Sequence, residues 1–341
     1  MELFIFTFLL ILVGHFFIKL SGKYNLVIIL ITISSSLIVG TRGVNAGFDT
    51  YKYVDYFNDL KYLKNITNLD SVYSLNFKFD YLFKVFTFCL AQLNFSGQEY
   101  IFICSFISIL LFLYVLRKVF KDLFLCVFLG FFSFPGFVVT FGNTIRQGLA
   151  LPFMLLSVYY LINGNKKRSV FFIIITFFFH NFTGIIALVV FLGFNFNLLR
   201  RVMNSLLGYF IFFIPLLGYL LSSILFRFYP SYYFETVSLV YVYHYTFIIG
   251  FLLFVFFKLE RKEKFLNDGL MMIFIILLIT ANFFSFNEVA FGRFLYLPFT
   301  FLIYYLYMFF RKYKLELFYY VILFLLGIYF INSEATLQTL S

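Results

Sequence analysis

The feature that most constrains this chain is a succession of continuous apolar runs, most of them 15 to 20 residues long. A helix of about 20 apolar residues spans the hydrocarbon core of a bilayer. Strands of an outer-membrane barrel would alternate apolar and polar residues instead. The sequence therefore predicts an all-α, polytopic membrane bundle of about 10–12 transmembrane helices, forming a single membrane domain over residues 1–341. The predicted spans are 3–18, 26–40, 98–116, 123–140, 147–162, 170–180, 184–198, 204–225, 239–257, 269–286, 294–310 and 318–332.

Composition excludes the other broad classes. Apolar residues make up 63% of the 341 residues and charged residues only 12%, about half the ~25% of a soluble domain. This excludes a soluble enzyme, a disordered chain, a disulfide scaffold and a nucleic-acid-binding domain. Cys89, Cys104 and Cys126 have no CxxC spacing and lie in or beside apolar runs, so we expect buried thiols.

Short basic connectors between the runs predict the orientation. They hold most of the 26 lysines and arginines, and such residues mark the cytoplasmic side of a membrane protein. The first run lacks a basic leader and a cleavage site, so we expect a permanent helix. The clusters are Lys19 and Lys23; Arg117, Lys118 and Lys121; Lys166, Lys167 and Arg168; Arg200 and Arg201; Lys258, Arg261, Lys262 and Lys264; Arg311, Lys312 and Lys314.

This orientation has two consequences. The stretch 168–200 must leave the cytoplasmic side and return, and the polar break from His180 to Gly184 supplies a turn at the outer face. The loop 41–78 and Ser96 both become external, so 79–95 is expected to be a re-entrant or interfacial helix. If 79–95 does cross the membrane, the N-terminal half is inverted.

The external loop 41–78 contains an amphipathic segment. Tyr53, Tyr56, Phe57 and Leu60 recur at steps of three and four residues, which is typical of one face of a helix. We expect this helix to lie in the membrane interface with its aromatic edge toward lipid headgroups.

Three arginines stand where an external loop meets a span: Arg42, Arg146 and Arg293. A guanidinium can grip phosphate oxygens with two parallel hydrogen bonds, which a lysine cannot do. Arg146 and Arg293 each open a predicted helix, whose N-terminus also favours an anion. The pattern predicts a diphosphate site near the outer face. The alternative is that these side chains simply reach to lipid headgroups.

Two residues are candidates for proton transfer. His180 could accept a proton from an acceptor hydroxyl, or it could cap a broken helix. Asp49 could pair with Arg42, bind acceptor hydroxyls, serve as the base, or cap the helix that begins near Thr50. Glu288 is a further possible carboxylate or a partner for Arg293.

The remaining histidines and motifs indicate no other chemistry. His15 is expected to be a core histidine of the first span, and His244 an interfacial residue among tyrosines. No carboxylate pair has metal-ligand spacing, and no nucleotide-binding, serine-hydrolase or zinc-protease motif occurs. We therefore expect neither a metal nor a cofactor.

In order and spacing, five short motifs resemble the EpsG/Wzy group of bacterial polysaccharide polymerases. Phe79-Asp80-Tyr81 departs from that group, which more often has a glutamate there. The motifs are Arg42 with Gly47-Phe48-Asp49-Thr50-Tyr51; Phe79-Asp80-Tyr81; Ile145-Arg146-Gln147-Gly148; Phe179-His180-Asn181; and Gly292-Arg293-Phe294.

The resemblance implies an O-antigen or other surface polysaccharide polymerase of the bacterial cytoplasmic (inner) membrane, with its active site facing the periplasm. It would transfer a glycan from undecaprenyl diphosphate to the next lipid-linked repeat unit. Membrane lipid surrounds the protein, and a chain-length regulator is a possible partner protein. Gln147 and Tyr51, within the matching motifs, are secondary site candidates.

Three alternatives remain open at this point. A flippase or exporter of the lipid-linked unit would have basic residues along a central path, whereas those here gather at one face. An O-antigen ligase usually has a larger external loop. A membrane acyltransferase would use His180 as its base, but its usual early histidine and long basic loops are not evident.

Overall fold

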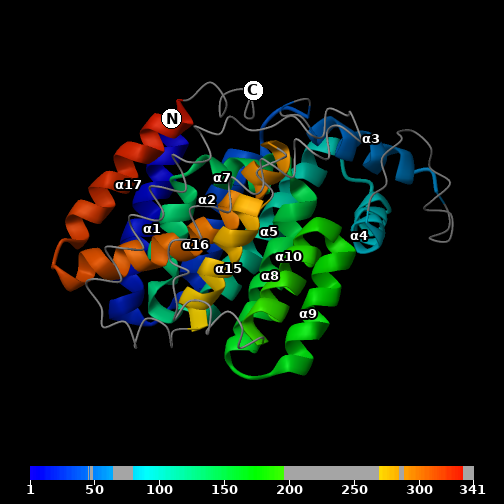
Figure 1. Cartoon of the computed structure of the whole chain (residues 1–341). Coiled ribbons are helices and arrows are strands. Elements are labelled where there is room, and N and C mark those ends of the chain that lie inside the picture. Colours follow the sequence, from blue (N-terminus) through cyan, green and yellow to red (C-terminus); the bar gives the residue numbers. More distant parts are fainter. Residues whose placement is uncertain (45, 47–48, 64–79, 196–268, 284–287, 333–341) are drawn as a thin grey trace. The chain divides into compact units, whose positions relative to one another are not determined.

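The computed structural model describes residues 1–44, 46, 49–63, 80–195, 269–283 and 288–332, and all their regular elements are helical (Figure 1). The all-α prediction is therefore confirmed. Three described stretches are long and apolar enough to cross a membrane: Glu2–Ser21, Gly97–Phe132 and Ile145–Ile162. Shorter apolar helices are Tyr24–Gly40, Tyr81–Ala91, Asn181–Asn195, Gly269–Leu278 and Glu316–Ile331. The predicted spans 204–225 and 239–257, and His244, lie outside the described residues.

The chain forms two compact units. One comprises Met1–Ala187 and Phe310–Ser341, and the other comprises Leu188–Phe309. The prediction of a single membrane domain over 1–341 stays a prediction. The elements are α1 (Glu2–Ser21), α2 (Tyr24–Gly40), α3 (Thr50–Leu60), α4 (Tyr81–Ala91), α5 (Gly97–Phe120), the 3₁₀ turn η2 (Lys121–Leu123), α6 (Phe124–Phe132), α7 (Pro135–Val138), the π-helix η3 (Val139–Asn143), α8 (Ile145–Ile162), α9 (Lys166–Phe179), α10 (Asn181–Asn195), α15 (Gly269–Phe283), α16 (Glu288–Lys312) and α17 (Glu316–Ile331).

In the first unit, consecutive helices pack side by side. Helix α1 contacts α2 and α6, α2 lies along α5, and α5 contacts α8, which lies along α9. The C-terminal helix α17 returns to α1, where the rings of Phe8 and Phe324 lie 5.2 Å apart. Phe112 on α5 is fully buried and packs against Phe131 and Phe141, with ring centroids 5.3 Å away in both cases. Aromatic side chains thus fill the space between the helices.

The predicted span 123–140 is broken, and that prediction of one continuous helix is wrong. Helix α6 ends at Phe132, and Phe134 is extended immediately before Pro135. A proline disfavours helical geometry at the preceding residue, which explains the break. The chain then continues through α7 into the five-residue π-helix η3.

The predicted turn between 168 and 200 is present. Helix α9 ends at Phe179, His180 is extended, and α10 begins at Asn181. A Cβ on Gly184 would overlap the backbone of Phe177. The two helices are therefore in close backbone contact just after the break, as in a helical hairpin, and only a glycine fits at this point.

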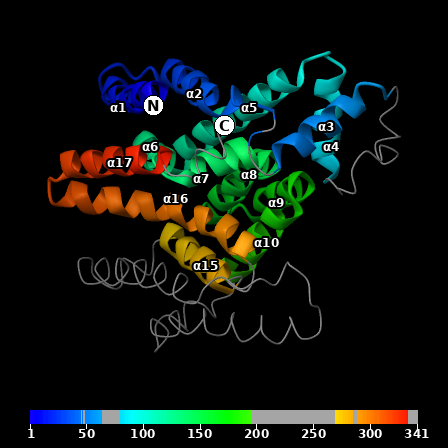
Figure 2. The same cartoon turned by 90° about the horizontal axis from the view of Figure 1, so that it is seen from above.

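The amphipathic helix in 41–78 is present as α3, but its aromatic edge does not face lipid headgroups. Tyr53, Tyr56, Phe57 and Leu60 are at most 5% exposed. They pack with α4, which lies beside α3 in Figure 2, and with the start of α5. The Phe57 ring stacks on Tyr100 at 4.3 Å. The expectation of a lipid-facing edge is wrong because the protein itself supplies the apolar partner for this face. The position of α3 in the membrane interface stays a prediction.

Helix α4 has 11 residues, or about 16 Å at 1.5 Å per residue, which is too short to cross a bilayer of ~30 Å. This length supports the expectation of a re-entrant or interfacial helix at 79–95. One cysteine differs from expectation, since Cys89 on α4 is exposed whereas Cys104 and Cys126 are buried. It lies on the side of α4 away from the packed face.

In the second unit, α15 packs against α16. The rings of Phe274 and Tyr305 lie 6.5 Å apart. The end of α10 also meets α15, since a Cβ on Gly193 would lie 3.2 Å from the side chain of Ile276. These contacts are apolar, as expected for helices within a membrane bundle.

Candidate functional site

Arg146, in the first turn of α8, forms an ion pair with Asp80. Its Nη1 lies 2.8 Å from Oδ2 of Asp80, at the N-cap of α4. The other carboxylate oxygen of Asp80 accepts the backbone N–H of Asn181, the first residue of α10, at 3.3 Å. One carboxylate therefore joins the starts of three helices.

Helix α3 also contacts Arg146, through Tyr53. The Arg146 Nε donates to the hydroxyl of Tyr53 at 3.5 Å, and its guanidinium carbon lies 5.9 Å from the centre of that ring. The Tyr53 ring in turn packs edge-on against Phe83 of α4, at 5.5 Å. Arg146 is thus placed by a carboxylate and an aromatic face, and 21% of its side-chain surface remains exposed.

Arg42 lies close by but is more deeply buried, with only 4% of its surface exposed. Its Nη2 donates to Oγ1 of Thr50 at 2.6 Å and to the backbone carbonyl of Gly142. Arg42 therefore links the end of α2, the start of α3 and the π-helix η3. A neighbouring contact strengthens the same junction, since Asn143 Oδ1 accepts the backbone N–H of Asp49 at 3.0 Å.

Burial shifts the pKa of Arg42 and of Asp80, the charged groups at these junctions. Loss of solvation lowers the pKa of Arg42 to about 10, which still leaves the guanidinium positively charged at neutral pH. Burial also raises the pKa of Asp80, while the charge of Arg146 acts in the opposite direction. The site thus combines a buried guanidinium with a buried carboxylate whose pKa is raised by burial and lowered by the adjoining Arg146.

Asp49 stands at the N-cap of α3, but its side chain does not cap that helix. Its Oδ1 pairs instead with Nζ of Lys52 at 2.9 Å, and 21% of the Asp49 side chain is exposed. Of the secondary candidates, Tyr51 is exposed at 42% beside Lys52, whereas Gln147 is buried. Asp49 and Tyr51, at the start of α3, are therefore more accessible to a ligand than Gln147.

His180 caps the start of α10. Its Nδ1 accepts the backbone N–H of Thr183 at 3.3 Å and lies 2.7 Å from the Thr183 hydroxyl. Because Nδ1 acts as an acceptor, the neutral ring carries its proton on Nε2. His180 is buried and adjoins Asn181, which Asp80 binds.

Arg293 lies in the second turn of α16, which begins at Glu288, so the expectation that it opens a helix is wrong. The structure does not describe the side chains of Arg293 and Glu288. The convergence of Arg293 with the other two arginines stays a prediction. Arg42 and Arg146, in contrast, both lie against the N-terminal half of α3, through Thr50 and Tyr53 respectively.

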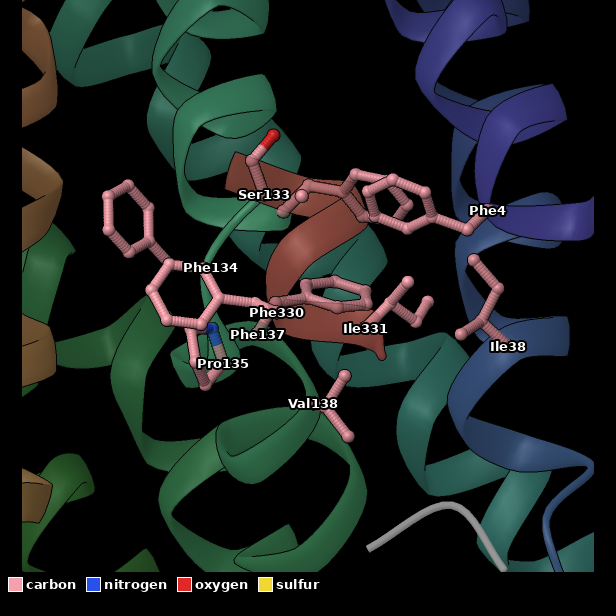
Figure 3. Close-up of a pocket in the computed structure, with 11 residues that line it drawn as sticks. Phe4, Ile38, Ser133, Phe134, Pro135, Phe137, Val138, Phe330 and Ile331 are labelled. Atoms are coloured by element: carbon pink, nitrogen blue, oxygen red, sulfur yellow. The ribbon is translucent and has the colours of Figure 1, made fainter. Parts of the chain in front are cut away.

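Two other features of the first unit, an apolar pocket and a buried histidine, are assigned to packing. A small pocket beside the Pro135 break is lined almost entirely by apolar side chains (Figure 3). His15 is buried as expected, with Cys126 Sγ 3.5 Å from its Nε2. Within the described ranges, no group of three or more histidines, cysteines or carboxylates could hold a metal ion.

Sequence reasoning did not single out Asp80, Tyr53 or Asn143 as site residues. Asp80 could have been recognised from the sequence, because a carboxylate directly before an apolar run needs a buried partner. The sequence pattern places Tyr53 on a lipid-facing edge, and Asn143 falls in the short connector between the predicted spans 123–140 and 147–162. Their roles depend on contacts between segments far apart in the chain, which periodicity does not reveal.

Fold and site together define the class: a polytopic helical membrane protein with a cluster of charged residues at the starts of α4, α8 and α10. A comparison with protein families then shows that the chain belongs to the EpsG family, whose model matches residues 25–337. This family is associated with exopolysaccharide synthesis. No curated protein and no solved structure matches the chain.

Proposed function

We propose that this protein polymerises a surface polysaccharide from polyprenyl-diphosphate-linked repeat units, at the outer face of the bacterial cytoplasmic membrane. The observation that carries the proposal is the position of Arg146. It lies in the first turn of α8, is partly exposed, and is oriented by Asp80 and Tyr53. A guanidinium at a helix N-terminus suits a diphosphate, and the family is associated with exopolysaccharide synthesis.

In the proposed reaction, a sugar hydroxyl of one lipid-linked unit attacks the anomeric carbon of the other. The bond between that carbon and the diphosphate oxygen breaks, and its electron pair leaves with the polyprenyl diphosphate. Arg146 stabilises the negative charge that develops on this leaving group. The donor is already activated, so the reaction needs no nucleotide.

We propose that Asp49 is the base that accepts the proton of the attacking hydroxyl. Asp49 is partly exposed and lies one helical turn before Tyr53. His180 is less suited to this role because its Nδ1 already accepts the backbone N–H of Thr183. Its Nε2–H is suited to donating to a diphosphate oxygen. Arg42, which is buried, contributes positive charge without contacting the ligand and holds η3 in place through the carbonyl of Gly142. Arg293 remains a candidate third cation.

The direct test is complementation of a deletion strain with Arg146→Ala, with the polysaccharide separated on a gel. We expect a single repeat unit in place of long chains, because the unit is still made and exported. Arg168→Ala is the matched control, since Arg168 is exposed in the first turn of α9. Normal long chains from Arg146→Ala would contradict the proposal, and loss of all surface glycan on deletion would indicate a flippase.

A further inference from the structure

The Asp80 carboxylate has an unusual set of partners for a residue at a helix N-cap. Such a residue usually accepts a backbone N–H from the first turn of its own helix, but the Asp80 side chain makes no such bond. Its two oxygens go instead to Arg146 of α8 and to the backbone of Asn181 in α10. The side chain is only 4% exposed.

A carboxylate in this setting is costly to bury unless each oxygen is paired. Here the pairing is divided between two helices that each carry a proposed functional group. Helix α8 carries Arg146, and the residue before α10 is His180. The Asp80 side chain therefore connects these two helices, through Arg146 and through the backbone of Asn181.

Asp80 itself is held on a rigid support. Phe83, in the first turn of α4, is fully buried against Tyr53. One turn further, Thr87 shares a hydrogen bond of 3.1 Å with the hydroxyl of Tyr100 on α5. Helix α4 thus cannot shift without disturbing α3 and α5.

We propose that Asp80 is a positioning residue, whose carboxylate holds the Arg146 guanidinium and the start of α10 together so that Arg146 and His180 act on one diphosphate. This inference rests on the proposed function for the identity of the ligand. It assigns Asp80 no contact with substrate. Its role is to fix the relative placement of two groups that do make contact.

The kinetic test uses the full-length chain in nanodiscs with a polyprenyl-diphosphate-linked donor. Asp80→Asn keeps the shape but removes the charge, and we expect kcat to fall about tenfold or more because misplaced groups lose transition-state contacts. Asp80→Glu should restore part of this loss. The KM for the donor should change much less than kcat. Asp55→Asn, an exposed aspartate of α3, is the control and should behave as the wild type.

Double variants test whether the two residues act as one unit. If Asp80 works through Arg146, combining Asp80→Asn with Arg146→Lys should be little worse than Arg146→Lys alone. Unchanged kcat in Asp80→Asn, or effects that multiply in the double variant, would overturn the inference.

Hydrogen exchange of the same protein separates this inference from the proposed function. Asp80→Ala should accelerate exchange in peptides covering 179–184, since Asn181 loses its acceptor, whereas Asp55→Ala should not. If the wild type transfers no glycan but Asp80→Ala shows this acceleration, the function is wrong and the positioning role stands. If exchange at the start of α10 is unchanged, the positioning role is wrong whatever the activity.

Discussion

Arg42 and Arg146 carry the same charge but have different surroundings, and this difference assigns them different tasks. Arg42 is almost fully buried, and its Nη2 donates to Thr50 and to the carbonyl of Gly142. A Cβ on Gly142 would lie 2.8 Å from Nη1 of Arg42, so this glycine leaves the space that the guanidinium fills. Arg146 keeps a fifth of its side chain exposed. We therefore expect Arg146 to meet the ligand and Arg42 to support the backbone around it.

His180 has two roles that can be tested separately: its Nδ1 caps α10, and its Nε2–H is proposed to donate to the diphosphate. His180→Asn preserves a side-chain acceptor for the N–H of Thr183, since asparagine is a favourable N-cap, but it removes Nε2–H. We expect thermal stability near that of the wild type and a transfer rate about 10–100-fold lower, as for loss of a hydrogen bond to a charged group.

His180→Ala serves as the comparison in the same thermal and transfer assays. It should lose the cap as well, at a cost of about 1 kcal/mol in stability. Wild-type transfer by His180→Asn would show that His180 is a cap alone.

At the scale of the helices, the sequence predicted where most elements lie but not which surfaces they meet. Long apolar runs gave α1, α2, α5, α8 and α17 within a few residues, because burial in lipid requires continuous apolar helices. The break at Phe134 was missed although Pro135 marks it, since hydropathy does not register a change of backbone direction. The amphipathic pattern of α3 was recognised, but a lipid-facing edge and a protein-facing edge look alike in sequence.

The buried position of α3 gives a spectroscopic prediction. The chain contains no tryptophan, so Phe57→Trp introduces a single reporter into the core between α3 and α5. We expect brominated lipids to quench its fluorescence only weakly.

Phe171→Trp, at a position 56% exposed on α9, should be quenched strongly in the same lipids. Equal quenching at the two sites would contradict the packing of α3 against protein.

The hairpin of α9 and α10 depends on the close approach at Gly184. Gly184→Ala would force the added methyl group against the backbone of Phe177, and overpacking of this kind costs about 1–3 kcal/mol. We expect a lower Tm in a thermal-shift assay, together with reduced transfer, because His180 lies at the same turn.

The control for Gly184→Ala is Ile185→Ala, which changes the neighbouring residue at a position that is 41% exposed. Its Tm should stay close to that of the wild type. A Gly184→Ala protein with an unchanged Tm would contradict the close packing of the two helices.

For the molecule as a whole, composition and hydropathy were sufficient to predict a polytopic helical membrane protein. The candidate site was predictable only in part. Arg42, Arg146, Asp49 and His180 were recognised by residue type and position, and the structure places these four around the starts of α3, α8 and α10. Asp80 and Tyr53, which orient Arg146, required the tertiary contacts. The outward orientation of the site remains a prediction from the basic connectors.

The central claim is that Arg146 assists departure of a lipid diphosphate while a glycan grows. The most direct measurement uses the purified chain in liposomes with the lipid-linked repeat unit as sole substrate, counting released polyprenyl diphosphate and new glycosidic bonds. We predict one diphosphate released per bond, and a rate about 10–100-fold lower for Arg146→Lys but unchanged for Arg168→Lys. Chain growth by Arg146→Lys at the wild-type rate, or bonds formed without matching release, would contradict the account.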